Sequence, residues 1–264
     1  MKKLHINIIK SLFYAYSPLK TNQELLNTLK KLKVPTTNPN THNIRELYNK
    51  LILKSFLNES AIKAAFVKRY GFKKSPECTV TIFELNSCNS RADLCMVNGE
   101  SVAYEIKTEY DTYIRLDNQL SDYLKLHDYV SVIIPESQVV NIIDITEDNI
   151  GIIFYSQNRL GNIVFNEYRQ PKLNKQIDSF AQLSQLTKRE LINIVGFNTL
   201  SKDDLIQQAV LTFNKEEINN HYRKYLKQKY FKKWNFLYAN QKDLYPLDYQ
   251  WFFKNNLPTE TVYK

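Results

Sequence analysis

The fold is decided by residues 90–108, which read SRADLCMVNGESVAYEIKT. Two runs rich in β-branched and aromatic residues flank Asn98-Gly99, a dipeptide typical of hairpin turns, so the stretch predicts strands over 92–97 and 102–107. A helical repeat of apolar residues follows over 115–127. Short runs of the same strand-like texture predict further strands over 79–85, 129–134, 139–145 and 151–155.

A helix over about 59–70 precedes these strands. The order of one helix, three strands, a crossover helix and more strands predicts an α/β fold with a mixed central sheet. Residues 1–57 predict a helical, basic N-terminal region that contains a turn cluster at 35–40. Residues 58–175 form the expected core, and residues 176–264 a helical C-terminal region.

Composition excludes several classes of protein. The five glycines are too scattered for a dinucleotide-binding or P-loop motif, which need several glycines together around a phosphate. The three cysteines lack metal-site spacing, which favours a reducing, cytoplasmic setting. No run of about 18 apolar residues occurs, so we expect no membrane span.

Charge is unevenly distributed along the chain, which has a net charge of +9. Residues 1–50 hold nine basic and two acidic side chains, residues 51–180 fourteen and seventeen, and residues 214–264 ten and five. Basic ends suit a polyanionic partner, because each neutralised phosphate releases counterions. A lysine-rich solvated surface is the alternative.

Within the C-terminal region, residues 186–206 contain two short helical patterns joined by Gly196. They weakly resemble the helical hairpin of SAP-type DNA-binding modules, and a structural hairpin is the alternative. The last fifty residues interleave bases with rings, which suits nucleic-acid stacking or, equally, a helix that docks its aromatic residues on the core. The candidate nucleic-acid contacts are Lys188, Lys202, Arg223, Lys224, Lys232 and Lys233.

The strongest candidates for catalytic and metal-binding residues are Asp93 and the stretch Glu105-Ile106-Lys107. Strand side chains alternate between faces, so Glu105 and Lys107 point the same way while Ile106 points into the core. If Asp93 shares their face, two carboxylates and an ammonium group converge. Oxygen ligands of this kind suit Mg²⁺.

The hairpin decides whether Asp93 shares that face. A two-residue turn at Asn98-Gly99 leaves Asp93 on the wrong side of the sheet, whereas a three-residue loop at 97–99 pairs Asp93 with Ala103 and places it diagonal to Glu105. We therefore expect an odd-length connection or a compensating bulge.

The pattern D-(x)11-E-x-K formed by these residues resembles the signature of the PD-(D/E)XK nuclease superfamily. The surrounding residues fall in order and spacing like a small bacterial branch of that superfamily, over about residues 59–170. Ala92 stands where the superfamily name has proline. The further matching positions are Glu59, Glu84, Arg91, Asp111, Arg115, Gln119 and Tyr123.

The resemblance implies a restriction-endonuclease-like αβββαβ core and a divalent metal, Mg²⁺ with Mn²⁺ as a substitute. It implies that Asp93, Glu105 and the Ile106 carbonyl hold the metal and that Lys107 orients the attacking water. Gln119 would reach the phosphate or the metal's waters, and Glu59 would position a second metal or the water.

Each of the other positions has a structural alternative. A glutamate such as Glu59 in a first helical turn is expected from the helix dipole alone. Arg115 can pair with Asp111 four residues earlier, Glu84 can pair with Arg91, and Tyr123 can pack in the core. His127 lies on the apolar side of its helix and is expected to be a core histidine.

These observations predict a metal-dependent nuclease that hydrolyses phosphodiester bonds in DNA, in a defence, mobile-element or repair context. The alternative is a catalytically inactive nucleic-acid-binding or scaffold protein with the same fold. Cutting both strands of a duplex usually needs two active sites, so a homodimer or a partner complex is a further expectation.

Overall fold

The computed structural model describes residues 4–35, 44–196 and 201–263, which form two compact units. Packing does not follow the expected regions 1–57, 58–175 and 176–264, because each unit joins segments that are far apart in sequence. The turn cluster at 36–40 and residues 197–200 lie outside the described residues. Unit 1 comprises Met1–Lys73, Ser156–Val164 and Asn235–Lys264, and unit 2 comprises Lys74–Tyr155 and Phe165–Trp234.

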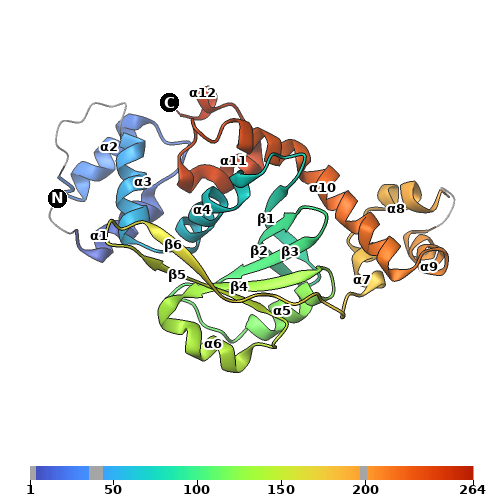
Figure 1. Ribbon diagram of the computed structural model, residues 1–264. Helices are drawn as coiled ribbons and strands as arrows, with labels where there is room; N and C mark the ends of the chain where they lie inside the picture. The colour runs from blue at the N-terminus through green and yellow to red at the C-terminus, as the bar shows by residue number, and fades with distance from the viewer. Residues whose placement is uncertain (1–3, 36–43, 197–200, 264) are drawn as a thin grey trace. The chain divides into compact units, whose positions relative to one another are not determined.

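A six-stranded sheet runs through the chain in sequential order, and most of it belongs to unit 2 (Figure 1). The first three strands pair antiparallel, and the third, fourth and fifth pair parallel, so the sheet is mixed as expected. The strands are β1 (Val80–Ser87), β2 (Ser90–Val97), β3 (Ser101–Ile106), β4 (Tyr129–Pro135), β5 (Gly151–Gln157) and β6 (Ile163–Arg169).

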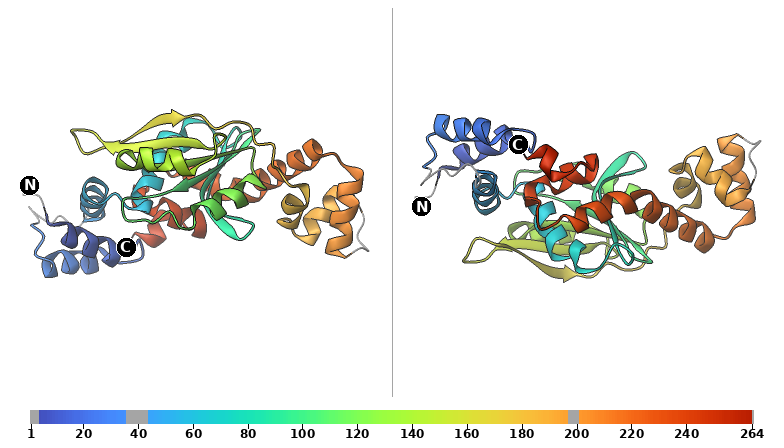
Figure 2. Two further views of the ribbon diagram at one scale, coloured as in Figure 1. Left: turned by 90° about the horizontal axis from the view of Figure 1, so that it is seen from below. Right: turned by 90° about the horizontal axis from the view of Figure 1, so that it is seen from above.

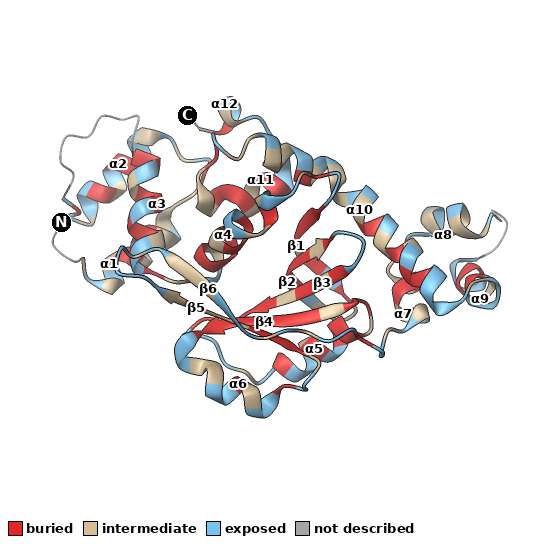
Figure 3. Cartoon of the chain, in the orientation of Figure 1, coloured by how far each residue is buried: buried red, intermediate tan, exposed pale blue. Residues whose placement is uncertain are grey.

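Helix α5 (Leu116–Leu124) makes the crossover between the parallel strands β3 and β4. The apolar repeat expected over 115–127 is confirmed, because Leu116, Leu120 and Tyr123 are buried in one core cluster with residues of β2 to β5. Figure 3 shows the same alternation as buried and exposed bands along α5. Packing of this helix therefore brings its polar residues to a fixed place beside the strands.

The strand expected over 139–145 is wrong, since these residues form helix α6 (Val139–Ile145) after a short 3-10 turn, Glu136–Gln138. Val139, Ile142 and Ile143 follow the helical spacing i, i+3, i+4 and pack on the core cluster. A β-branched composition thus concealed a helical period. Strand β6, next to β5, was not expected from the sequence.

Unit 1 is helical apart from the strand ends that it includes. Its helices bury an apolar core whose members include Ile9, Leu29 and Tyr48. The Tyr16 and Tyr263 hydroxyls both donate to Asp248, at 2.8 and 2.7 Å, which joins the two ends of the chain within this unit. The helices are α1 (Ile6–Ala15), α2 (Asn22–Lys31), α3 (Ile44–Ser55), α4 (Glu59–Arg69) with the 3-10 turn Gly71–Lys73, the 3-10 turn Pro246–Asp248, α11 (Tyr249–Asn255) and α12 (Thr259–Val262).

After the sheet, unit 2 continues with three short helices, α7 (Ser179–Ser184), α8 (Lys188–Val195) and α9 (Lys202–Thr212). Capping boxes at Thr187 and Ser201 begin α8 and α9, and Gly196 ends α8 with a φ of 84°, as expected for these residues. Helix α10 (Lys215–Ala239) follows, and Figure 2 shows its whole length.

In the part of the chain that the structure describes, no helix is both long and apolar enough to cross a membrane.

Candidate active site

The loop between β2 and β3 decides whether the two candidate acids share a face. Val97 pairs with Ser101, so the loop consists of residues 98–100. The odd length expected from the sequence is confirmed, although the loop lies one residue further along than 97–99. Gly99 occupies its middle with a φ of 102°, a conformation that glycine adopts without strain.

This register corrects the expected pairing of Asp93 with Ala103, because Ala103 pairs with Cys95. One step beyond the last paired residues, Asp93 stands opposite Glu105. Opposite residues of an antiparallel pair project from the same face, so the parity that the site needs is present. Asp93 is 9% exposed, and its Oδ2 accepts a hydrogen bond from the Ile106 backbone N–H at 2.7 Å.

Glu105 is the centre of a buried polar cluster. Its side chain is 3% exposed, and Lys107 Nζ donates to Oε1 at 2.8 Å. Gln119 Nε2 donates to the same oxygen at 2.6 Å, and the Tyr123 hydroxyl lies 2.6 Å from Oε2. A buried carboxylate needs such donors, because an ionised group without partners is costly to remove from water.

Lys107 is held from several sides. Its ammonium group donates to Gln119 Oε1 at 2.8 Å, so the Gln119 amide bridges the lysine and Glu105. The Lys107 backbone N–H donates to Ile133 O at 2.9 Å, and the Tyr155 hydroxyl lies 3.4 Å from the Lys107 carbonyl. No sequence pattern marks Tyr155 for this supporting role, because it is one aromatic residue among many in strands.

Tyr123 packs in the core, as its structural alternative predicts, and it also contacts the site. Its hydroxyl lies 2.6 Å from Glu105 Oε2 and 2.9 Å from the Arg91 carbonyl. A hydroxyl has one proton, and the carboxylate is the stronger acceptor. Burial, and then the charge of Glu105, raises the pKa of Tyr123 well above its usual range, so this hydroxyl remains a donor.

Glu84 on β1 adds a third carboxylate. It interrupts the pairing of β1 with β2 at the position that faces Asp93, and its φ is 55°, a left-handed conformation that costs a non-glycine residue about 1–3 kcal/mol. Carboxylate oxygens of Glu84 and Asp93 lie within 4.8 Å of each other. The expected pairing with Arg91 is confirmed, since Arg91 Nε lies 2.6 Å from Glu84 Oε2.

Three further matching positions are Asp111, Arg115 and Glu59. Asp111 accepts hydrogen bonds from the Thr108 backbone and hydroxyl, both at 2.7 Å. The alternative pairing of Asp111 with Arg115 is wrong among the described residues, because α5 begins only at Leu116 and Arg115 precedes it, exposed to solvent. Glu59 belongs to unit 1, where it begins α4 and lies 2.5 Å from Lys63 Nζ.

The candidate nucleic-acid residues differ in exposure. Lys188, Lys202, Lys224 and Lys232 are exposed, whereas Lys233 is half-buried. Lys202 Nζ also donates to the Ser184 carbonyl at 2.9 Å. The rings of Tyr222 and Trp234 on α10 are buried, so they are packed in the protein and do not form a stacking surface. Docking of the helix by its aromatic residues is thus the better description.

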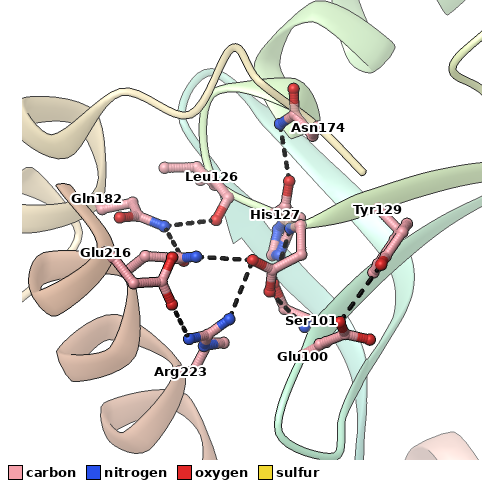
Figure 4. Close-up of polar contacts among 11 residues, drawn as sticks. Glu100, Ser101, Leu126, His127, Tyr129, Asn174, Gln182, Glu216 and Arg223 are labelled. Carbon is pink, nitrogen blue, oxygen red and sulfur yellow. Dashed lines mark hydrogen bonds and ion pairs between the residues drawn. The ribbon is translucent and has the colours of Figure 1, made fainter. Parts of the chain in front are cut away.

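Arg223 is engaged in a second buried network, which Figure 4 shows. Its guanidinium lies 3.1 Å from Asp128 Oδ1 and 2.8 Å from Glu216 Oε1. Asp128 also accepts from Asn219 Nδ2 at 2.6 Å and from the backbone and hydroxyl of Ser101 at 2.7 and 2.8 Å. This arginine therefore anchors α10 to the start of β3, which argues against a role in binding phosphate.

His127 is buried beside this network, as expected for a core histidine. Its Nε2 lies 3.3 Å from Ser87 Oγ, and burial lowers its pKa to about 4.

Comparisons with known proteins add one informative match. A family model described as bacteriophage P4 protein cII matches residues 53–250. No curated protein matches the chain. Among solved structures, the SPO1766 protein of unknown function from Silicibacter pomeroyi is similar over 59% of this chain and 86% of its own, with 14% sequence identity. Its TM-score of 0.35 is too low to support a conclusion about fold or function.

Proposed function

The chain belongs to the family of bacteriophage P4 protein cII, whose name states no activity. From the candidate site alone, we propose that the protein is a metal-dependent nuclease that cleaves DNA. One observation carries the proposal. Asp93 stands opposite Glu105 on the neighbouring strand, and Lys107 and Gln119 contact one and the same oxygen of Glu105.

The order of elements supports a restriction-endonuclease-like core of the PD-(D/E)XK kind. Helix α4 precedes β1, β2 and β3, and α5 crosses to β4, which gives the sequence αβββαβ. The acids lie on β2 and β3 and the lysine directly follows β3, as the D-(x)11-E-x-K pattern requires.

The donor set fits a hard divalent cation such as Mg²⁺ or Mn²⁺. Asp93 and Glu105 supply carboxylate oxygens, the Ile106 carbonyl is the backbone candidate, and Glu84 is close enough to Asp93 to contribute. Glu105 Oε2 is engaged by one donor, Tyr123, and a carboxylate oxygen can accept a second partner. Such a cation acidifies a bound water and stabilises charge that develops on the phosphate.

The remaining residues of the cluster do what a phosphodiester reaction needs from the protein. Lys107 places an ammonium group beside Glu105, where it orients the attacking water and offsets negative charge on the phosphate. Gln119 fixes the position of that ammonium group, and Tyr123 fixes the Glu105 carboxylate. The chain thus holds its reacting groups in place before substrate arrives.

Cleavage of plasmid and linear DNA in Mg²⁺ or Mn²⁺ tests the proposal. We expect cleavage by the wild type and its loss in Asp93→Asn and Lys107→Ala. Asp144→Asn and Lys172→Ala are the matched controls, because both residues are exposed and lie outside the cluster. Equal cleavage by all five proteins would remove Asp93 and Lys107 from the reaction. No cleavage by the folded wild type would favour an inactive binding protein.

A further inference from the structure

The segment between the lysine and the glutamine of the site, residues 108–115, carries features that the cluster does not use. We call it the lip segment. It directly follows Lys107 and ends one helical turn before Gln119, and Gln119 contacts Lys107. Because a residue spans at most about 3.6 Å of chain, every Cα atom of the lip segment lies within about 22 Å of the Cα atom of Lys107 or of Gln119.

Hydrogen bonds hold the first half of this segment. Asp111 accepts from the Thr108 backbone and hydroxyl, and the Tyr110 N–H donates to Thr108 Oγ1 at 3.3 Å. Ser137 donates to Glu109 at 3.2 Å. The outward side chains are therefore carried on an ordered backbone.

Side chains of the lip segment point in two directions. Tyr113 packs against the core cluster that includes Leu116 and Leu120. Ile114, the next residue, is 84% exposed, and Tyr110 is 57% exposed. An anchored segment that turns one ring inward thus exposes an aliphatic side chain and a second ring to solvent, in the stretch of chain between Lys107 and Gln119.

Arg115 adds a positive charge at the same place. It is exposed and stands four residues before Gln119, whose N–H donates to the Arg115 carbonyl at 3.1 Å. Residues with this spacing lie on one side of a helical turn, about 6 Å apart along the axis. A substrate that reaches Gln119 therefore passes close to the guanidinium group.

We propose that the lip segment binds unpaired nucleotides, so that the substrate is single-stranded DNA rather than continuous duplex. This inference rests on the proposed nuclease function for the identity of the polymer. Tyr110 stacks on an exposed base, Ile114 contacts the face or edge of the next, and Arg115 binds a phosphate between them. Base faces are covered in a duplex, and they are available to rings and aliphatic wedges only when strands separate.

Binding to a single-stranded oligodeoxynucleotide that contains 2-aminopurine, and to a blunt duplex of the same sequence, tests this assignment. The full chain is used as Lys107→Ala in Mg²⁺, and as wild type in EDTA, so that the DNA stays intact in both arms. We expect tighter binding of the single strand and quenching of 2-aminopurine. Loss of one stacked base should weaken that binding about fivefold or more in Tyr110→Ala and in Ile114→Ala.

Three variants make the test specific. Tyr110→Trp retains an aromatic face and should keep the binding and the quenching. Tyr168→Ala and Leu211→Ala remove side chains that are 54% and 82% exposed on β6 and α9, and both should bind like the parent. Preference for the duplex, or equal binding by the lip variants and the parent, overturns the inference.

The outcome is separate from that of the nuclease proposal. Single-strand binding that depends on the lip segment, without cleavage by the wild type, supports the inference and contradicts nuclease activity. Cleavage that needs Lys107, with no effect of Tyr110→Ala or Ile114→Ala on single-strand binding, supports nuclease activity and contradicts the inference about the lip segment.

Discussion

Two buried carboxylates lie near opposite ends of β3 and have different surroundings. Asp128 contacts the first residue of the strand, and Glu105 is next to its last residue. Asp128 is bonded to Ser101 at the start of β3, and its other partners are Asn219 and Arg223 of α10 (Figure 4). Each of these contacts joins separate parts of unit 2, and Arg223 balances the charge of Asp128.

Glu105, near the end of β3, also has hydrogen-bond donors and one cation, Lys107. Its surroundings differ because Asp93 on β2 stands opposite it, and Glu84 on β1 lies close to Asp93, so three carboxylates stand on consecutive strands. Stability alone does not favour three carboxylates on adjacent strands, because like charges repel. We take the Asp128 network as an anchor and the Glu105 cluster as a site prepared for a cation.

The largest expected effect is a loss of cleavage when the Glu105 cluster is changed, which should not occur when the Asp128 network is changed. Glu105→Gln should lower cleavage about 10²–10⁴-fold, because it weakens the metal ligand set and removes the charge that holds Lys107. Its free energy of unfolding should stay within about 1 kcal/mol of wild type, since one acid of a crowded group is neutralised. Urea denaturation beside the cleavage assay checks both parts, and strong destabilisation would make Glu105 an anchor like Asp128.

The matching change in the other network should have the opposite profile. Asp128→Asn removes the buried one of the two charge partners of Arg223 and leaves exposed Glu216 as the other, and it turns an amide donor toward other donors, so we expect about 3–5 kcal/mol of destabilisation. Cleavage at a temperature where the variant is folded should be close to wild type. A stable but inactive Asp128→Asn protein would show that the anchor belongs to the site.

His127 gives the anchor region a pH signature. Its pKa is lowered to about 4 in the folded chain by burial, against about 6.5 when unfolded, so the unfolded state binds the extra proton between these values. Stability from this residue is present above pH 6.5 and is lost as pH falls toward 4, by up to about 3.4 kcal/mol. The difference between wild type and His127→Gln in denaturation over pH 4–7 isolates the effect, and a constant difference would contradict it.

Asp248 in unit 1 should show the reverse sign. Burial raises its pKa to about 6, so the folded state favours the protonated acid, and stability falls as pH rises from about 4 to 6 by up to about 3 kcal/mol. Asp248→Asn should therefore gain stability relative to wild type across this range. A loss of stability in Asp248→Asn relative to wild type over this pH range would mean that the hydroxyls of Tyr16 and Tyr263 stabilise the ionised Asp248 carboxylate.

The last expected effect concerns Tyr123, and it is small in both stability and activity. Tyr123→Phe removes the donor to Glu105 and keeps the ring in the core, so the free energy of unfolding should fall by about 1 kcal/mol. The KM for DNA should change little while kcat falls, because the hydroxyl positions a carboxylate and does not contact DNA. An unchanged kcat would limit Tyr123 to packing.

Much of the sheet was predictable because its signals are local. The strands around residues 90–108 and the apolar side of α5 follow from residue alternation and helical spacing. The helix at Val139–Ile145 was mistaken for a strand, since three of its apolar residues have helical spacing but all are β-branched. Local composition outweighed periodicity in that prediction.

The candidate site shows how far sequence reaches: its residues can be named from the sequence, but their relative geometry cannot. The sequence indicates Asp93, Glu105 and Lys107, but the displaced loop that puts Asp93 opposite Glu105 depends on how three backbone residues turn. The roles of Arg223 and of the Tyr222 ring depend on long-range packing of α10, which charge and aromatic content along the chain do not contain.

Binding of Mn²⁺ to the full chain, followed by electron paramagnetic resonance or calorimetry, tests the central claim most directly. We predict that wild type and Asp128→Asn, measured where both are folded, bind Mn²⁺ at the same site, and that Asp93→Asn combined with Glu105→Gln loses it. Unchanged Mn²⁺ binding in the folded double variant would contradict the account, because the two facing acids would then not hold the cation.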